Sequence, residues 1–466
     1  MSSGRTPPNI LLITADQLRY DCVEPNAPGA PVTPNLARLA AEGVRFAQAY
    51  SHVPVCGPAR QSLLCGRRPE SFGGLWNAGA ALSVGSLSPD DWTWPKALQG
   101  RGYGSAFLGK WGVHPRLGPT AYGYDRAIGA ADYEAFRKAA YPDVAFAGGF
   151  FGEPNPIPVE DAPTHWLARQ AVREIERLHA EGRPWHVALH FEEPHLPCRP
   201  SGRFSDMYSP ADMRPWPGFG DTFEGKPYIQ RQQLHSWGVE SYEWADWAPI
   251  VARYYSVVSQ LDDAIGLVLR ALDRLGAARD TLIVFTADHG DMCGSHGMMD
   301  KHYIMYDDVV RVPMVVRWGG ALPAGAVCDR FTYGFLDLAP TIAEAAGLDR
   351  PERLHGASLL PLLQGAEKAG SWRDAVVATY NGQQFGLYCQ RMIRTDRWKY
   401  VWNLTDVDEL YDMGADPGEL VNRIGDASLA GIVSELRRRL YEALRADGDG
   451  FDNEWTRRQL LEGRKL

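Results

Sequence analysis

Residues 9–16 read NILLITAD, and residues 281–288 read TLIVFTAD. Each stretch is a short apolar run that ends in Thr-Ala-Asp, and Gln17 follows the first run while His289 follows the second. Continuous apolar runs of this kind are typical of central parallel strands that are buried on both faces. Because parallel strands place their carboxyl ends at one edge of a sheet, we expect the two terminal aspartates to meet there.

The polar residues at these two strand ends form a candidate metal site. Asp16, Gln17, Asp288 and His289 offer mostly oxygen ligands and one imidazole. Such a set suits a hard or borderline divalent ion, namely Ca²⁺, Mg²⁺ or Mn²⁺. A zinc site built on thiolates is less compatible with these ligands. A single aspartate at a strand end often only caps a turn, but two matching strand ends favour a shared site.

The first 365 residues alternate between strand and helix patterns. This alternation indicates an α/β fold with a large mixed, mostly parallel sheet sandwiched by helices. Further strands are expected at residues 44–50, 103–108, 186–191 and 312–317, and helices at residues 33–43, 94–98, 164–181 and 245–275. Many Gly, Pro and aromatic residues predict long loops over residues 115–163, and the excursion over residues 198–245 is long enough to suggest a functional loop.

Residues 366–466 have a different pattern and are expected to form a small C-terminal subdomain. Short strands at residues 375–380, 387–395, 398–402 and 409–412 indicate a small antiparallel sheet, and a helix is expected over residues 429–444. The chain then ends in a charged stretch that reads as an exposed tail. We therefore divide the chain into an α/β domain over residues 1–365 and a subdomain over residues 366–466.

Composition and charge exclude several classes of function. The formal net charge of −9 over 466 residues argues against a general nucleic-acid binder, so an anionic ligand would need a local positive site. No window has the length and apolarity of a membrane span, and residues 1–8 do not form a signal peptide. The seven cysteines are scattered and lack zinc-type pairs, which predicts no disulfide framework and a cytoplasmic location.

A second informative stretch, residues 54–67, reads PVCGPARQSLLCGR. Pro58 suits the first turn of a helix, and Gly66 suits its end. Cys56 would then lie at the positive end of the helix, where Arg60, about one turn further on, can lean back over the same spot. A cysteine near a helix start is, by itself, more often a small buried apolar residue than a nucleophile.

This stretch resembles the signature of the type I sulfatases of the alkaline phosphatase superfamily, Cys-x-Pro-Ser/Ala-Arg followed by an apolar run and Gly-Arg. Cys65 departs from the signature, since the family usually has Thr or Ser there. The resemblance extends from Asn9 to about Asp416. It implies that a formylglycine-generating maturation enzyme oxidises Cys56 to formylglycine, which serves the family as nucleophile beside a divalent metal.

The resemblance also implies roles for the strand-end residues. Sulfatases place metal ligands after their first strand and late in the domain, which assigns the metal to Asp16, Gln17, position 56, Asp288 and His289. Gln17 departs from the commoner second Asp of the family. The Asp-Gln and Asp-His combination also occurs in related phosphonate and phosphate monoester hydrolases. Ca²⁺, usual for sulfatases, is the expected ion, with Mn²⁺, usual for the phosphorus enzymes, and Mg²⁺ as alternatives.

Four cationic residues match positions that bind the sulfate group in the family. Lys110 matches the lysine that contacts both formylglycine and sulfate, and His195 matches the histidine on the sulfate. Lys301 matches the later lysine, and Arg60 steadies the formylglycine hydrate. Either His195 or Lys301 is expected to protonate the leaving group.

One family histidine is absent. Many sulfatases have a histidine at the position that Gly112 occupies here, and His114 is expected to take its role in expelling sulfate. His296 and His302 are further candidates for the site. The loop Tyr380–Gln384 belongs to a region that often borders the pocket in the family, so it is a candidate for substrate contact.

The resemblance implies an enzyme that hydrolyses a small-molecule sulfate ester, with a sulfated carbohydrate as one candidate. A phosphonate or phosphate mono- or diester hydrolase of the same superfamily is the nearest alternative. A non-catalytic binding protein that is never matured is another. A thiol redox role for Cys56 and Cys65 is the least favoured, because their spacing is not that of a Cys-x-x-Cys pair.

Overall fold

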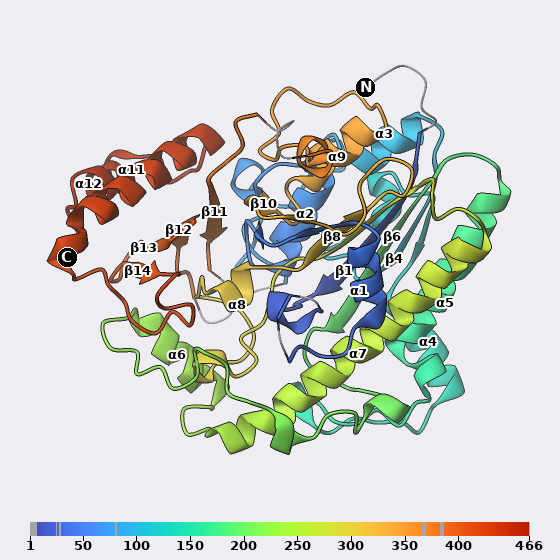
Figure 1. The fold of residues 1–466 in the computed structure, drawn as a ribbon, viewed down its shortest axis with the longest axis horizontal. Helices are drawn as coiled ribbons and strands as arrows, with labels where there is room; N and C mark the ends of the chain where they lie inside the picture. Colours follow the sequence, from blue (N-terminus) through green and yellow to red (C-terminus); the bar gives the residue numbers. More distant parts are fainter. Residues whose placement is uncertain are drawn as a thin grey trace.

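The computed structural model describes residues 7–24, 26–27, 29–79, 82–365, 370–382 and 386–465. Its central layer is an eight-stranded sheet with the strand order β5-β4-β6-β1-β7-β8-β2-β9 (Figure 1). These strands are β1 (Asn9–Asp16), β2 (Val44–Phe46), β4 (Gly104–Gly109), β5 (Arg126–Ile128), β6 (Trp185–Pro194), β7 (Thr281–Ala287), β8 (Met314–Arg317) and β9 (Ala326–Cys328). The strands from β5 to β7 run parallel, whereas β8 is antiparallel to both of its neighbours. The predicted mixed, mostly parallel sheet is confirmed.

The two apolar runs with matching ends are neighbouring central strands. β1 and β7 pair in parallel, with Thr14 opposite Thr286 and Ala15 opposite Ala287. Nearly all of their side chains are buried, as the continuous apolar pattern predicts. The residues that follow therefore leave the sheet side by side. β6 flanks β1 on its other side and β4 lies beyond β6, so four strand ends supply loops to one edge of the sheet.

Helices cover both faces of this sheet (Figure 1). One face carries α1 (Pro34–Ala41), α5 (Pro163–Ala180) and α7 (Trp244–Arg274), and the other carries α2 (Cys56–Cys65), α3 (Trp94–Gly100) and α9 (Leu338–Ala345). Shorter helices are α4 (Ala130–Ala140), α6 (Tyr228–Trp237), α8 (Asp307–Val310) and α10 (Leu360–Leu363). Proline in the first turn of α1, α3 and α5 supplies a fixed φ and removes a backbone donor that would lack a partner there.

Two expectations for this body were wrong. The strand expected over residues 44–50 is divided, since β2 belongs to the large sheet whereas β3 (Ala49–Tyr50) pairs with β10 (Thr332–Tyr333) in a separate two-stranded sheet. The loops expected over residues 115–163 contain β5 and the eleven-residue helix α4. Nearby glycines and prolines concealed the short helical stretch from the sequence pattern. The excursion over residues 198–245 likewise contains α6.

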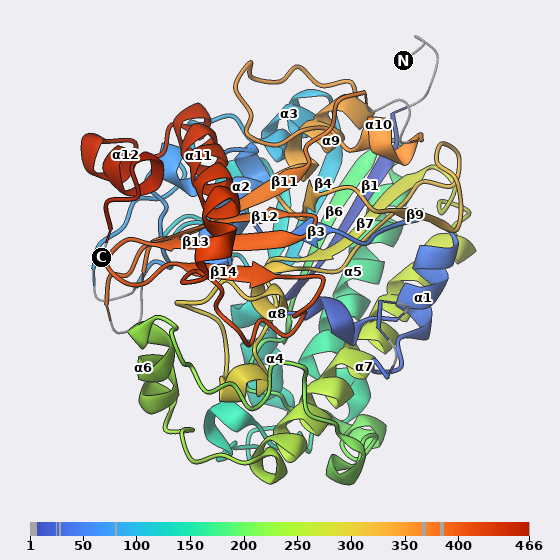
Figure 2. The same ribbon diagram turned by 60° about the vertical axis from the view of Figure 1, so that its left-hand side comes forward.

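The C-terminal subdomain has its own sheet and core. β11 (Ala375–Tyr380), β12 (Gln390–Thr395), β13 (Trp398–Asn403) and β14 (Glu409–Asp412) form an antiparallel sheet in chain order. Helix α11 (Ala430–Asp447) lies across it (Figure 2). The expected exposed tail was wrong in part, because α12 (Glu454–Leu461) forms there and buries Leu460 in this core. The boundary at residues 365 and 366 stays a prediction, since residues 366–369 lie outside the described part of the chain.

Within the described ranges, every helix is too short or too polar to cross a bilayer.

Gly109, the last residue of β4, permits the close pairing that carries Lys110 to the sheet edge. Its φ is +98°, and a Cβ there would lie 1.9 Å from the carbonyl oxygen of His190. We expect Gly109→Ala to lower the free energy of unfolding in urea by about 3 kcal/mol or more, through backbone strain and overlap. Gly118→Ala is the matched control, because nothing lies within 4 Å of its Cβ position. Equal unfolding midpoints for the two variants would contradict this reading.

Candidate active site

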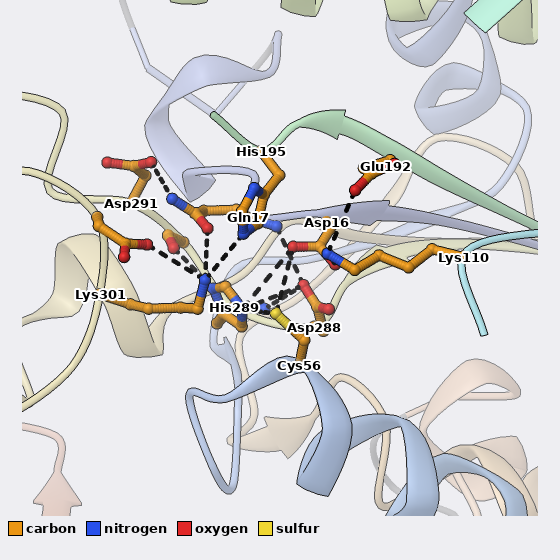
Figure 3. A network of polar contacts seen from close by, with 12 residues as sticks. Asp16, Gln17, Cys56, Lys110, Glu192, His195, Asp288, His289, Asp291 and Lys301 are labelled. Carbon is orange, nitrogen blue, oxygen red and sulfur yellow. Dashed lines mark hydrogen bonds and ion pairs between the residues drawn. The ribbon is translucent and has the colours of Figure 1, made fainter. Parts of the chain in front are cut away.

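The helix predicted after the Cys-Gly-Pro-Ala-Arg stretch forms, and Cys56 is its first residue. Val55 precedes α2 in an extended conformation, and Gly66 ends the helix in the left-handed region with φ 66°. Every residue of α2 is buried. The backbone N–H of Gly57 donates to Oδ1 of Asn77 at 2.7 Å. The thiol of Cys56 thus points from the head of the helix at the ends of β1 and β7 (Figure 3).

Four side chains meet at this point. Asp16, Cys56, Asp288 and His289 each place one potential ligand atom within 4.8 Å of the others, and all four are buried. The sulfur of Cys56 lies 3.1 Å from Nε2 of His289 and 3.5 Å from Oδ1 of Asp16. The predicted convergence of the two strand ends on position 56 is therefore observed.

The tautomer of His289 suits a metal ligand. Its Nδ1 donates to the carbonyl oxygen of Gly290 at 2.9 Å, so the lone pair of Nε2 faces the cluster. Burial lowers the pKa of His289, against the charges of Asp288 and Asp16 that would raise it. The neutral imidazole is the form that binds a metal.

The carboxylates also fit a divalent cation. Burial alone would raise the pKa of Asp16, but the cations Lys110 and Arg60 hold it well below its usual range. Asp288 Oδ2 lies 3.0 Å from Nη2 of Arg60, yet within the described chain it accepts no hydrogen bond. A buried and incompletely bonded set of carboxylate oxygens is what Ca²⁺, Mg²⁺ or Mn²⁺ would satisfy.

Gln17 lies beside this cluster rather than among the four converging ligand atoms. Its backbone N–H donates to Oδ1 of Asp288 at 3.0 Å. Its side-chain Oε1 accepts from Nζ of Lys301 at 2.7 Å, while Nε2 donates to Asp291. Gln17 therefore connects Asp288 of the cluster, through its backbone N–H, with Lys301, through its amide oxygen.

Cations surround the cluster, with Lys110 and Lys301 reaching it from opposite sides (Figure 3). Nζ of Lys110 lies 2.9 Å from Oδ2 of Asp16, and Nη2 of Arg60 lies 3.0 Å from the same oxygen. Burial would lower the pKa of both lysines. Asp16 instead raises that of Lys110, and Asp300 raises that of Lys301. Both ammonium groups therefore stay charged near Cys56.

His195 lies beside the cluster in direct contact with Lys301. Its Nδ1 donates to the carbonyl oxygen of Leu196 at 2.7 Å, so the lone pair of Nε2 faces Nζ of Lys301 at 3.1 Å. This contact joins two groups that the sequence predicted as alternative proton donors. A proton on Lys301 can reach His195 directly.

The remaining histidine candidates take different places. His114 accepts the backbone N–H groups of Arg116 and Leu117 at Nδ1, and among the described residues it forms no hydrogen bond or ion pair with the cluster. His296 stacks on Tyr306 and contacts Asp221, away from position 56. His302 lies next to Lys301, with Nε2 3.6 Å from Oδ2 of Asp300.

Two further predictions concern the substrate loop and the absent histidine. Tyr380 is buried against His302, whereas Gln383 and Gln384 of the candidate loop Tyr380–Gln384 lie outside the described residues. Gly112 has φ +64°, and a Cβ there would lie 3.2 Å from Cδ of Arg60. The role predicted for His114 stays a prediction.

Several residues of the site were missed from the sequence. Asn77 binds the head of α2, and His190 Nδ1 accepts from Nη1 of Arg60 at 3.0 Å. Asp291 and Asp300 flank the Gln17–Lys301 contact. Of these, Asp291 and Asp300 had a signal, since Asp291 lies three residues after Asp288 and Asp300 directly precedes Lys301. The others come from loops or strands whose neighbours are distant in the chain.

A cavity of about 450 Å³ opens beside the cluster on the α4 and α5 side. Lys110 and His195 form part of its lining, together with Glu193 and the aromatic residues Tyr133, Phe146 and Trp166. Burial, assisted by the charge of Glu192, raises the pKa of Glu193 to about 7. The cavity therefore begins beside the cluster, and its wall combines aromatic rings with charged groups of both signs.

Comparison with known proteins identifies the family. The family model described as Sulfatase matches residues 8–348. The chain belongs to the sulfatase family. The model of the N-sulphoglucosamine sulphohydrolase C-terminal region matches residues 294–446 of this sulfatase. The resemblance inferred from the Cys56 signature is confirmed, and the protein is a sulfuric ester hydrolase.

Similar sulfatases and a similar solved structure align with nearly the whole chain. A choline-sulfatase of Rhizobium meliloti is 29% identical, covering 97% of this chain and 89% of its own. An N-acetylglucosamine-6-O-sulfatase of Bacteroides thetaiotaomicron is 26% identical, covering 96% and 88%. Among solved structures, a phosphonate monoester hydrolase of Agrobacterium radiobacter superposes with a TM-score of 0.82 at 26% identity, covering 94% and 96%.

Metal binding can be tested without turnover. We expect Ca²⁺ or Mn²⁺ to raise the Tm, because an ion at a hundredfold excess over Kd stabilises the folded state by about 2.7 kcal/mol. Asp288→Asn removes an anionic ligand and should abolish most of this rise. The exposed Asp329→Asn should keep it. An ion-dependent Tm shift in Asp288→Asn equal to that of the unaltered protein would exclude this site.

Proposed function

We propose that the protein hydrolyses a sulfate ester with a formylglycine, made from Cys56, as nucleophile, and with a divalent cation held by Asp16, Asp288 and His289. Gln17 is the remaining ligand implied by the family pattern. The observation that supports this is the position of the Cys56 sulfur at the head of α2, within 4.8 Å of both strand-end carboxylates and the imidazole. Ca²⁺ is the proposed ion because most of the ligands are oxygens. The imidazole ligand favours Mn²⁺ as the alternative.

Formylglycine and the divalent cation would supply the attacking hydroxyl and the positive charge of the reaction. Hydrated formylglycine supplies one hydroxyl that attacks sulfur and a second whose deprotonation restores the aldehyde and releases sulfate. The cation supplies charge that favours the ionised hydroxyl. Neither serine nor unmodified cysteine at position 56 has the second hydroxyl.

The chain's own residues would then manage charge and protons. Asp288, whose Oδ2 accepts no hydrogen bond within the described chain, would accept the proton of the attacking hydroxyl. Lys110 and Lys301, on opposite sides, would bind the sulfate oxygens as negative charge builds on them. Lys301 would protonate the leaving alkoxide, either directly or through Nε2 of His195, 3.1 Å away.

Maturation and location follow from the same proposal. The protein requires a formylglycine-generating enzyme as partner during its synthesis. We place it in the cytoplasm, where the seven cysteines, all unpaired in the structure, would remain reduced.

Phosphonate or phosphate ester hydrolysis is the second candidate. It is favoured by the Asp16-Gln17 and Asp288-His289 ligand pattern and by the similarity to the phosphonate monoester hydrolase of Agrobacterium radiobacter. The same cationic clamp can hold a tetrahedral phosphorus centre as readily as a sulfur centre.

The nucleophile is tested by mass and activity together. In protein made with an active maturation enzyme, a peptide spanning residue 56 should show an aldehyde in place of the thiol. Cys56→Ala should lose about a thousandfold or more in kcat, because the covalent route is removed. Cys65→Ala, a buried thiol elsewhere on α2, should keep the aldehyde and most activity. Full activity in Cys56→Ala would refute the mechanism.

Substrate class is tested by side-by-side kinetics. We expect kcat/KM for 4-nitrophenyl sulfate to exceed that for 4-nitrophenyl phosphate and for phenylphosphonate 4-nitrophenyl ester by about tenfold or more, a transition-state preference of about 1.4 kcal/mol or more. Measurements use one preparation loaded with Ca²⁺ and, separately, with Mn²⁺. If kcat/KM is higher for the phosphorus esters than for the sulfate ester with both ions, the protein is a phosphonate or phosphate ester hydrolase.

A further inference from the structure

The cavity beside the cluster is the natural place for the alcohol part of a substrate. Lys110 and His195 line both the cavity and the reacting centre. An ester whose sulfate group lies between Lys110 and Lys301 has its leaving oxygen near His195. The rest of the alcohol then extends into the roughly 450 Å³ of space between α4, α5 and the loop after β6.

Most charges around the cavity are already matched within the chain. Arg137 makes two hydrogen bonds of 2.8 Å with Glu134 and a third of 3.0 Å with the carbonyl oxygen of Val144. Arg199 lies 3.7 Å from Glu153 and stacks over Phe146 at 4.1 Å. Arg137 is therefore fully matched. Arg199 has no hydrogen-bond partner at Nε in the described chain and is balanced only by the nearby charge of Glu153 and the face of Phe146.

The charge of Lys110 is also balanced by a carboxylate of the chain. It pairs with Asp16 at 2.9 Å, and in a substrate complex it would face the sulfate group. Its distance to Glu192 is 3.9 Å, too long for a hydrogen bond, and the Glu192 side chain is 59% exposed. Glu192 is therefore only weakly neutralised.

Glu193 is the cavity carboxyl group that lacks an ion-pair partner among the described residues. Its side chain is half-buried in the lining and forms no ion pair within the described chain; its polar contact is with its own backbone, and Lys110 is the nearby cation that lowers its pKa against burial. It lies close enough to Tyr133 for its charge to raise the pKa of that phenol. Glu192 and Glu193 therefore have no close cation of their own, and because burial raises the pKa of Glu193, a cationic ligand beside it would favour its ionised form.

The aromatic wall suits the same kind of ligand. Trp166 stacks with Phe136 and meets Tyr133 edge-on at 5.4 Å, so these rings are held in place. The Phe146 ring already carries one cation, the guanidinium of Arg199. Aromatic faces next to a carboxylate are the usual surroundings of ammonium ligands.

We propose that this cavity selects sulfate esters whose alcohol part carries a positive charge, as a protonated amine or a quaternary ammonium group, with Glu193 as its counter-ion. This inference rests on the proposed function, since it assigns the leaving-group half of the same substrate. Glu193 contacts the alcohol part and takes no part in the chemistry at sulfur.

The experiment compares two esters of nearly equal shape. Choline sulfate carries the charge, and 3,3-dimethylbutyl sulfate replaces its nitrogen by carbon. With the matured, metal-loaded protein, kcat/KM for choline sulfate should be higher by about tenfold or more, the range expected for a desolvated ammonium among aromatic rings and a carboxylate. The ratio is the readout because a general loss of activity cancels in it.

Variants assign the preference to its residue. Glu193→Gln should reduce the ratio to about threefold or less, because it removes the charge and keeps the shape. Glu193→Asp should restore part of the ratio. Glu160→Gln, an exposed carboxylate outside the cavity, should leave the ratio unchanged.

Three results would overturn the inference. These are a ratio near one, a ratio that persists in Glu193→Gln, or faster turnover of 3-carboxypropyl sulfate than of both test esters. Turnover of 4-nitrophenyl sulfate separates this failure from that of the proposed function. Protein that carries the aldehyde and hydrolyses the nitrophenyl ester without preferring the cation refutes the cavity assignment alone. Protein that carries the aldehyde and hydrolyses no sulfate ester refutes both.

Discussion

The structure depends on the burial of two carboxylates side by side. Asp16 and Asp288 are 0% and 1% exposed, at the ends of strands that pair in parallel register. Bringing a charge into a protein interior costs several kcal/mol per ion unless opposite charge compensates it. Arg60 meets both carboxylates from α2, and Lys110 meets Asp16 from the end of β4. Helix α2 and the strand ends are thus held together by the same charges that form the site.

This arrangement explains how an acidic protein can bind an anionic ester. The formal net charge of −9 repels anions on average, but binding is governed by the local field. Around position 56, cationic side chains enclose the anionic centre, and burial in a region of low dielectric strengthens each interaction. An entering sulfate group would meet Lys110, whose side chain is 22% exposed, before it meets the fully buried Asp16.

The loop that carries Lys301 is held by parts of the chain that do not contact the cluster. Asp300, His302 and Tyr303 have left-handed φ values of 68°, 85° and 59°, a conformation that persists only where surrounding contacts enforce it. The C-terminal sheet supplies such contacts, since Nζ of Lys399 donates to the carbonyl oxygen of Met305 at 2.9 Å. The small subdomain therefore supports the geometry of the site, whether or not its loops contact substrate.

The sequence by itself determined the features that depend on neighbouring residues. Buried strands ending in Asp16 and Asp288 follow from continuous apolar runs, and the helix from Cys56 to Gly66 follows from its own Pro and Gly. Lys110, His195 and Lys301 were found only through resemblance, because isolated lysines and histidines have no local signature. Tertiary structure alone decided the division of β2 from β3, the His190–Arg60 contact and the cavity position of Glu193. Each of these depends on which distant segment lies alongside, and that choice is made by packing of the whole chain.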